Sequence, residues 1–349
     1  MKNFLLISLI SVATVSTTSA CTTFFIIKNG QMVFGRNYDW ITATGMVCTN
    51  LRGLQKTSMA NEDGRTISWT SEFGSITFNQ YGKEFPNGGM NEKGLVVELM
   101  WLDGTKYPNP DNRPAVNVLQ WIQYQLDRSA TVDDVIASDK IVRITGKGTP
   151  LHYLVADAAG HVATIEFLDG KMVVDSGEQL PFAVLTNSTY DASITQTNGD
   201  ANNRAFADNS IDRFAKACNM VQQYQLQDIN TPIVDYAFDV LNKVSQNNWT
   251  KWSIVYDITY KKIRFKSHGY PEIKTISFSS FNFSCASSAK MLDINQPGTG
   301  DVSSSFHNFS INDSRPLVEA AVNESKDQVT IPEETKQAIL NYPKEIKCK

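Results

Sequence analysis

The sequence contains few cysteines and histidines, and their spacing excludes the common metal and redox motifs. Among 349 residues there are 5 cysteines and 4 histidines, and no Cys-x-x-Cys pair occurs. The histidines are spread along the chain without the short spacings of metal ligands, at His152, His161, His268 and His307. We therefore expect neither a metal nor a cofactor.

Blocks of basic residues and long apolar runs are also missing. The chain has 32 basic and 36 acidic side chains, and no cluster of Lys and Arg suggests a nucleic-acid partner. The apolar stretch from Phe4 to Val15 is too short to span a bilayer, which takes about 20 residues. We expect no stable membrane insertion. A Gly-x-Ser-x-Gly nucleophile motif is absent too.

The first 20 residues have the features of a secretory signal peptide. Lys2 gives a positive start, the short apolar stretch follows, and Thr18-Ser19-Ala20 supplies the small residues that a signal peptidase recognises. Cleavage between Ala20 and Cys21 would place the protein in a periplasm or outside the cell. It would also leave Cys21 at the N-terminus, with a thiol and a free α-amine on one residue.

Two alternatives for Cys21 stay open at this point. In a lipoprotein, Cys21 would be lipidated and the chain would be a membrane-tethered binding protein without turnover. Lipoprotein signals usually have Leu three residues before the cysteine, whereas this chain has Thr18. The second alternative is an ordinary buried or disulfide-bonded cysteine. The residues that follow argue against it.

A β-hairpin is predicted directly after Cys21. Two runs rich in β-branched and aromatic residues, 21–27 and 32–40, flank Asn29-Gly30, a dipeptide that favours a tight turn. If these two residues form the loop, counting outward places Cys21 opposite Tyr38.

The same pairing brings Arg36 and Asp39 to Cys21, because diagonal neighbours in an antiparallel pair lie roughly 7–8 Å apart. A permanently charged arginine favours a thiolate and disfavours an ammonium nearby, and both shifts help a cysteine whose own α-amine is the base. Asp39 would accept a hydrogen bond from the α-amine and orient it.

Motifs in a fixed order resemble the choloylglycine hydrolase family of N-terminal nucleophile (Ntn) hydrolases, which contains penicillin V acylases and conjugated bile salt hydrolases. They are Cys21-Thr22 with Phe34-Gly35-Arg36-Asn37-Tyr38-Asp39, Gly89-Met90-Asn91-Glu92-Lys93-Gly94-Leu95, Val184-Leu185-Thr186-Asn187-Ser188 and Asp212-Arg213-Phe214. The resemblance implies an α+β fold, a four-layer αββα sandwich of two antiparallel sheets.

The resemblance also assigns roles to later residues. Asn187 matches the side-chain amide that stabilises the oxyanion, and Arg213 matches the last arginine of the catalytic site. Trp101 falls at a second oxyanion position, commonly Asn in bile salt hydrolases and Tyr in many penicillin acylases. An indole cannot replace an amide, so Trp101 is either a backbone donor with an apolar ring facing the acyl group or a core aromatic. Trp40 and Met100 are weaker candidates for substrate binding.

The sequence thus predicts a cysteine amidase that cleaves a linear C–N amide bond of a small N-acyl substrate through a thioester. The segment around Trp101 resembles penicillin V acylases of Gram-negative bacteria, which favours hydrophobic or aromatic acyl groups. Penicillin V leads, N-acyl homoserine lactones follow, and conjugated bile salts are the alternative. Assembly as a homo-oligomer is left open.

Three segments are expected: the signal peptide 1–20, the hydrolase domain 21–295, and a polar C-terminal extension 296–349 with the character of a linker and tail. Whether this extension packs on the body or mediates subunit contacts is left open. A meander of strands is predicted over 152–175, with helices over 114–127 and after Thr231-Pro232. Apart from Cys21 there are four cysteines, for which no pairing is indicated: Cys48, Cys218, Cys285 and Cys348.

Overall fold

Two sheets pack face to face in the computed structural model, which describes residues 21–349 apart from 60–64, 146–147 and 199–209. The predicted signal peptide lies outside the described residues. The first sheet has the order β14 (Val184–Leu185), β1 (Thr22–Lys28), β2 (Gln31–Asp39), β15 (Thr250–Asp257), β16 (Lys262–Ser267), β17 (Tyr270–Ser277) and β19 (Gly300–Asp301). All its neighbouring strands are antiparallel except β17 and β19.

The second sheet is antiparallel throughout its described pairs. Its order is β13 (Lys171–Ser176), β12 (Val162–Leu168), β11 (Leu151–Ala156), β8 (Val96–Trp101), β7 (Pro86–Asn91), β6 (Ser75–Asn79), β3 (Met46–Asn50), β18 (Lys290–Asp293) and β20 (His307–Asn308). The strands β11, β12 and β13 form the predicted meander.

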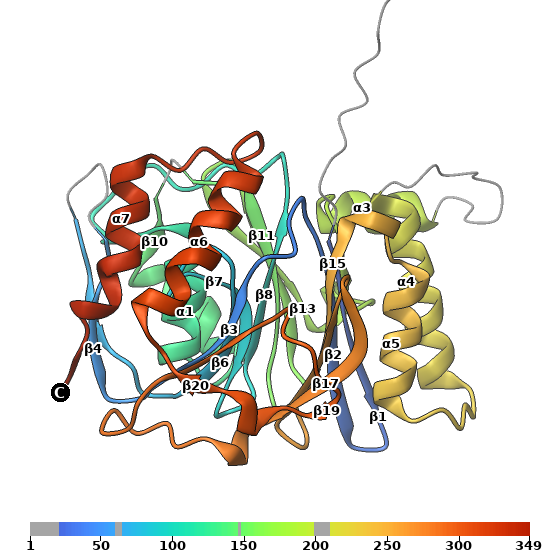
Figure 1. Cartoon of the computed structure of the whole chain (residues 1–349). Helices are drawn as coiled ribbons and strands as arrows, with labels where there is room; N and C mark the ends of the chain where they lie inside the picture. The colour runs from blue at the N-terminus through green and yellow to red at the C-terminus, as the bar shows by residue number, and fades with distance from the viewer. Residues whose placement is uncertain (1–20, 60–64, 146–147, 199–209) are drawn as a thin grey trace, which may run out of the picture.

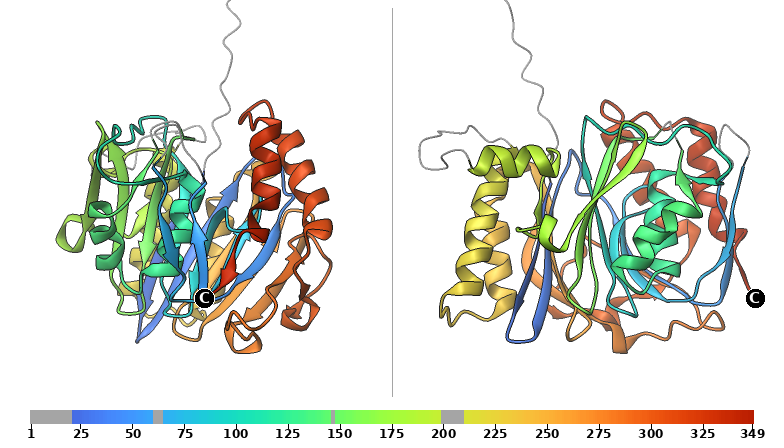
Figure 2. Two further views of the ribbon diagram at one scale, coloured as in Figure 1. Left: turned by 90° about the vertical axis from the view of Figure 1, so that its left-hand side faces the viewer. Right: turned by 180° about the vertical axis from the view of Figure 1, so that it is seen from behind.

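Helices cover the outer face of each sheet (Figure 1; Figure 2). On the first sheet lie α4 (Ser210–Leu226) and α5 (Ile233–Lys243), with α3 (Tyr190–Asn198) beside α4. On the second lie α1 (Val118–Arg128), α6 (Ile311–Ser325) and α7 (Glu333–Asn341), with the short α2 (Val132–Ala137) following α1. The predicted four-layer αββα sandwich is therefore confirmed. Within the described ranges, no helix combines the length and apolarity needed to cross a membrane.

The main core lies between the sheets, because their inner faces carry alternating large apolar side chains. Phe34, Trp252 and Tyr256 are fully buried there. Burying a side chain of this size contributes about 1.5–3 kcal/mol.

Local signals explain where the helices begin. Asn117 caps α1 by accepting hydrogen bonds from the backbone N–H groups of Leu119 and Gln120, so α1 starts at Val118. The predicted start at Pro114 is too early, because Ala115 and Val116 instead form β9 (Ala115–Val116), which pairs with β10 (Arg143–Ile144). The helix predicted after Thr231-Pro232 is present as α5.

The C-terminal residues differ from the predicted linker and polar tail. They add strands to the edges of both sheets, form α6 and α7, and end in β21 (Lys347–Cys348), which pairs with β4 (Leu54–Thr57); β4 also pairs with β5 (Ser68–Thr70). A disulfide joins Cys285 and Cys348, while Cys48 and Cys218 are buried thiols. Apolar residues spaced along α6 and α7 pack this segment on the second sheet.

Candidate active site around Cys21

The first hairpin places Cys21 directly before the first residue of β1, beside the last residues of β2. The register runs from Lys28 opposite Gln31 to Thr22 opposite Asn37, as the turn predicted. Asn29 and Gly30 have φ values of 51° and 77°, and two positive φ angles define the turn that suits a two-residue hairpin loop. Local turn chemistry thus fixes which charged residues reach the cysteine.

Arg36 lies buried between the two sheets and faces the sulfur of Cys21. Its Nη1 forms an ion pair with the Glu98 carboxylate and donates to the carbonyl of Asn87 at 3.2 Å. Its Nη2 donates to the carbonyl of Leu99 at 3.0 Å and lies 4.0 Å from Cys21 Sγ. Although burial disfavours its charge, the Glu98 carboxylate raises the pKa of Arg36, so the guanidinium stays charged.

The thiol of Cys21 is itself buried, with Sγ 3.9 Å from the carbonyl oxygen of Asp39. Burial raises the pKa of the Cys21 thiol, whereas Arg36 lowers it. A neutral thiol is a poor nucleophile, so Cys21 depends on Arg36 and on a nearby base to form the thiolate.

The carboxylate of Asp39 accepts hydrogen bonds from Thr250 Oγ1 and from Gln246 Nε2, the latter at 3.1 Å. Burial raises the pKa of Asp39 to about 6, although Arg213 and these two hydrogen bonds hold it down. Thr250 begins β15 and pairs with Asp39, so the neighbouring strand of the sheet orients the carboxylate.

Asn187 and Arg213 close the site from the other side. Arg213, on α4, donates through Nη1 to the carbonyl of Cys21 and to Thr22 Oγ1, both at 2.6 Å. Its Nη2 donates to Asn187 Oδ1 at 3.1 Å, and Asn187 Nδ2 donates to the carbonyl of Trp101 at 2.8 Å. Arg213 has no acceptor, so these contacts fix which way the Asn187 amide points. The bond to Trp101 uses one of the two N–H groups on Nδ2.

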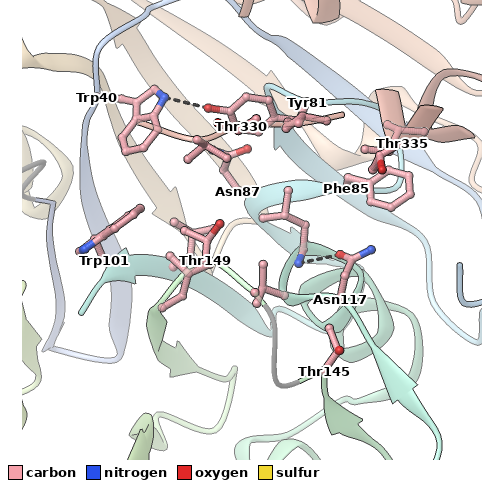
Figure 3. A pocket seen from close by; sticks show the side chains of 18 of the residues that line it. Trp40, Tyr81, Phe85, Asn87, Trp101, Asn117, Thr145, Thr149, Thr330 and Thr335 are labelled. Carbon is pink, nitrogen blue, oxygen red and sulfur yellow. Dashed lines mark hydrogen bonds between the residues drawn. The ribbon is translucent and has the colours of Figure 1, made fainter. Parts of the chain in front are cut away.

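A cavity of about 530 Å³ opens beside Cys21, in the size range of small-molecule sites. Among the described residues that line it, Asp39 is the only charged one. Figure 3 shows Trp40 and Trp101 at one end of the pocket and Asn117, Thr145 and Thr335 at the other. The walls are thus largely apolar, with neutral polar groups at the far end.

The two tryptophans named by the sequence lie together in this wall. Their ring centroids are 6.2 Å apart with an interplanar angle of 33°. Trp40 Nε1 donates to the hydroxyl of Tyr81 at 2.9 Å, and Trp101 Nε1 donates to Asp103. Of the two interpretations of Trp101, the structure favours an apolar surface facing the cavity.

Met100 does not have the substrate contact that the sequence suggested. Its side chain is fully buried in the core between the sheets, where its sulfur accepts a hydrogen bond from Thr23 Oγ1 at 3.0 Å. Leu99 and Trp101, its neighbours in β8, line the cavity instead. Successive side chains of a strand point to opposite faces, which explains the difference.

Sequence reasoning missed two parts of the site. Glu98 is a single acidic residue in an otherwise apolar strand, and this was the available signal for a buried charge partner. The second part is the segment from Val329 to Ile339, which forms a wall of the cavity. Its contribution depends on packing between residues about 300 positions apart, for which the sequence carries no local signal.

A helix-covered sandwich of two sheets with a cysteine at the start of an inner strand is the arrangement of Ntn hydrolases. The sequence model of the linear amide C-N hydrolases, choloylglycine hydrolase family, matches residues 21–203, more than half of the chain. The protein therefore belongs to the choloylglycine hydrolase family, which confirms the predicted resemblance.

A relative found by sequence similarity supports this placement. A penicillin V acylase from the Gram-negative bacterium Pectobacterium atrosepticum is 30% identical over 200 residues, which is 50% of this chain. The match spans 51% of that relative, so this chain aligns with about half of its length.

Two solved structures share the fold. The penicillin V acylase from Agrobacterium tumefaciens matches with a TM-score of 0.72 and 26% identity, over 83% of this chain and 98% of its own. A conjugated bile acid hydrolase from Clostridium perfringens matches with a TM-score of 0.66 over 80% of this chain and 98% of its own. At 15% identity, this second match concerns the fold alone.

Proposed function

We propose that the mature protein begins at Cys21, is secreted, and hydrolyses linear amide bonds of small N-acyl substrates. The observation that carries this proposal is the position of Cys21, which lines an apolar cavity with Arg36 and the carbonyl of Asp39 beside its sulfur. Arg213 donates to the Cys21 carbonyl and to Asn187. In the full-length chain the nitrogen of Cys21 belongs to a peptide bond, so the base appears only after cleavage before this residue.

The proposed reaction starts when the α-amine of Cys21 takes the proton of its thiol. The thiolate attacks the acyl carbonyl carbon, and the second N–H of Asn187 donates to the resulting oxyanion. The C–N bond then breaks, the α-ammonium gives its proton to the departing amine, and a thioester remains. Water attacks this thioester with the α-amine as base, which releases the acid and restores the thiol.

Two charged residues support this sequence of steps. Arg36 stabilises the thiolate, while Asp39 accepts a hydrogen bond from the α-amine and holds it beside the sulfur. Because Asp39 is itself fixed by Thr250 and Gln246, the base would be held in one orientation.

A hydrophobic or aromatic acyl group suits the cavity best. Trp40 and Trp101 present flat apolar surface, and the described lining offers no positive side chain for an anionic acyl group. Penicillin V is the leading substrate, consistent with the Pectobacterium and Agrobacterium relatives, which are penicillin V acylases. N-acyl homoserine lactones come next, and conjugated bile salts are the alternative.

The test is hydrolysis of penicillin V, an N-acyl homoserine lactone and taurocholate by the purified mature protein. Penicillin V should give the highest kcat/KM, and Cys21→Ser should abolish turnover because the hydroxyl is a much weaker nucleophile at neutral pH. Cys218→Ser is the matched control, since that buried thiol lies in the core and should leave turnover unchanged. A wide preference for taurocholate would overturn the substrate order, and turnover by Cys21→Ser would overturn the mechanism.

A further inference from the structure

A fully buried carboxylate lies behind the arginine of the site. Glu98, on β8 of the second sheet, has one oxygen paired with Arg36 Nη1, while the other accepts a hydrogen bond from the Tyr256 hydroxyl. Arg36 and Tyr256 belong to neighbouring strands of the first sheet. Glu98 therefore links the second sheet to the first through Arg36, the residue that faces Cys21.

The space for this carboxylate is provided by Gly88, the residue opposite Glu98 on β7. A Cβ atom at Gly88 would lie 2.0 Å from Glu98 Oε2, so any other residue there would displace the carboxylate. Only glycine at position 88 leaves room for the Glu98 carboxylate, so the fold provides a specific place for this side chain.

Arg36 is held by one charged partner and two backbone carbonyls. Nη1 pairs with Glu98 and donates to the carbonyl of Asn87, whereas Nη2 donates to the carbonyl of Leu99 and faces the sulfur of Cys21 at 4.0 Å. A guanidinium is planar and rigid, so fixing one nitrogen also fixes the direction of the other. We propose that Glu98 is a positioning residue for the amidase reaction, because it anchors Arg36 in the orientation that faces the thiol of Cys21.

This inference rests on the proposed function for its effect on turnover, but its effect on the thiol is measurable independently. Two substitutions separate the anchor from the charge. Glu98→Gln keeps an acceptor of the same shape for Nη1 but removes the negative charge, whereas Glu98→Ala removes both. Glu319→Gln is the matched control, because Glu319 pairs with Arg315 in an exposed ion pair on α6.

The experiment measures how fast iodoacetamide alkylates Cys21 across a pH series, read from the mass of the peptide that begins with Cys21. Burial raises the pKa of Glu98 to about 7, so above that pH the wild type carries the negative charge that Glu98→Gln removes. In Glu98→Gln the guanidinium keeps its place and its charge is no longer offset, so we expect faster alkylation than in the wild type above about pH 7. In Glu98→Ala the guanidinium loses its ion pair and keeps only the carbonyls of Asn87 and Leu99, so we expect alkylation about tenfold slower. Glu319→Gln should match the wild type.

Turnover gives the second readout. We expect kcat of Glu98→Ala to fall about 100-fold, as for other displacements of about 1 Å in a catalytic site, with KM nearly unchanged because the cavity wall is intact. If Glu98→Ala keeps the alkylation profile of the wild type, the positioning role is overturned, whatever the rate of Glu98→Gln. If the wild type cleaves none of the amides while the thiol responds as expected, the proposed function fails and the role of Glu98 stands.

Discussion

At the scale of single residues, Asp39 must be ionised to accept a hydrogen bond from the α-ammonium and orient it, although burial raises the pKa of Asp39 to about 6. Protonation of this carboxyl as the pH falls through about 6 should abolish activity, in addition to the loss caused by protonation of the α-amine, whose ordinary pKa is about 7.7–8.0. Between the ordinary value of 3.8 and about 6, the native state keeps a proton that the unfolded chain has released. This carboxyl thus lowers the free energy of unfolding as the pH rises through that window.

Thr250→Val tests this assignment. The Thr250 hydroxyl lowers the pKa of Asp39, so its removal should raise that pKa and move the acidic limb of the kcat/KM profile to higher pH. The measurement is kcat/KM across pH 4 to 9 for both proteins. A limb that stays in place, or moves to lower pH, would contradict the role given to Asp39.

Asn187→Ala tests the oxyanion contact. Losing one oxyanion donor typically lowers kcat by about 10² to 10³. We expect a loss of that size for Asn187→Ala with a smaller change in KM. Iodoacetamide should still alkylate Cys21 at the wild-type rate, since the thiolate is set by Arg36. An unchanged kcat would remove Asn187 from the mechanism.

At the scale of elements, the C-terminal segment forms one wall of the cavity and is held in place by a strand pairing and a disulfide. Ile331 and Ile339 line the cavity, and the chain beyond them returns to β4 and to the disulfide with Cys285. Substrate size is therefore expected to depend on residues that lie far from Cys21 in the sequence.

Ile331→Trp should fill part of the cavity. We expect KM to rise at least tenfold for amides with large acyl groups, whereas a small acyl amide should be cleaved as before. Leu226→Trp is the control, because Leu226 is 80% exposed on the far helical layer. Equal effects on large and small substrates would show that Ile331 does not shape the acyl pocket.

The disulfide should stabilise this arrangement. It closes a loop with a sequence separation of 63, and bridges of this kind typically contribute about 2–4 kcal/mol. We expect the Cys285→Ser/Cys348→Ser double variant to lose about that much free energy of unfolding in a urea titration. A variant with the stability of the wild type would show that the helices α6 and α7 hold the segment without the bridge.

At the scale of the whole molecule, the features that could be predicted from the sequence are those set by local turns and by a few side chains near them. The register of the first hairpin follows from the Asn29-Gly30 turn, and this register alone brings Arg36 and Asp39 beside Cys21. The layers were implied by family resemblance. The order of the strands, such as β15 beside β2, depends on pairing between residues more than 200 positions apart, and no local pattern specifies it.

Two further features could not be predicted, because they too depend on contacts between distant parts of the chain. They are the fold of residues 300–348 and the ion pair between Glu98 and Arg36. Apolar residues in α6 and α7 are too sparse to indicate which surface they cover, and a single Glu in a strand does not reveal its partner. Both become visible only when the two sheets are packed together.

The central claim is that cleavage before Cys21 exposes a nucleophile and its base on one residue. Its most direct test is the mass of the protein quenched in acid during turnover of penicillin V, followed by peptide mapping. We predict a chain that starts at Cys21 and carries the phenoxyacetyl group on its first peptide, lost on treatment with hydroxylamine. A chain that starts elsewhere, a lipid on Cys21, or an acyl group on another residue would contradict the account.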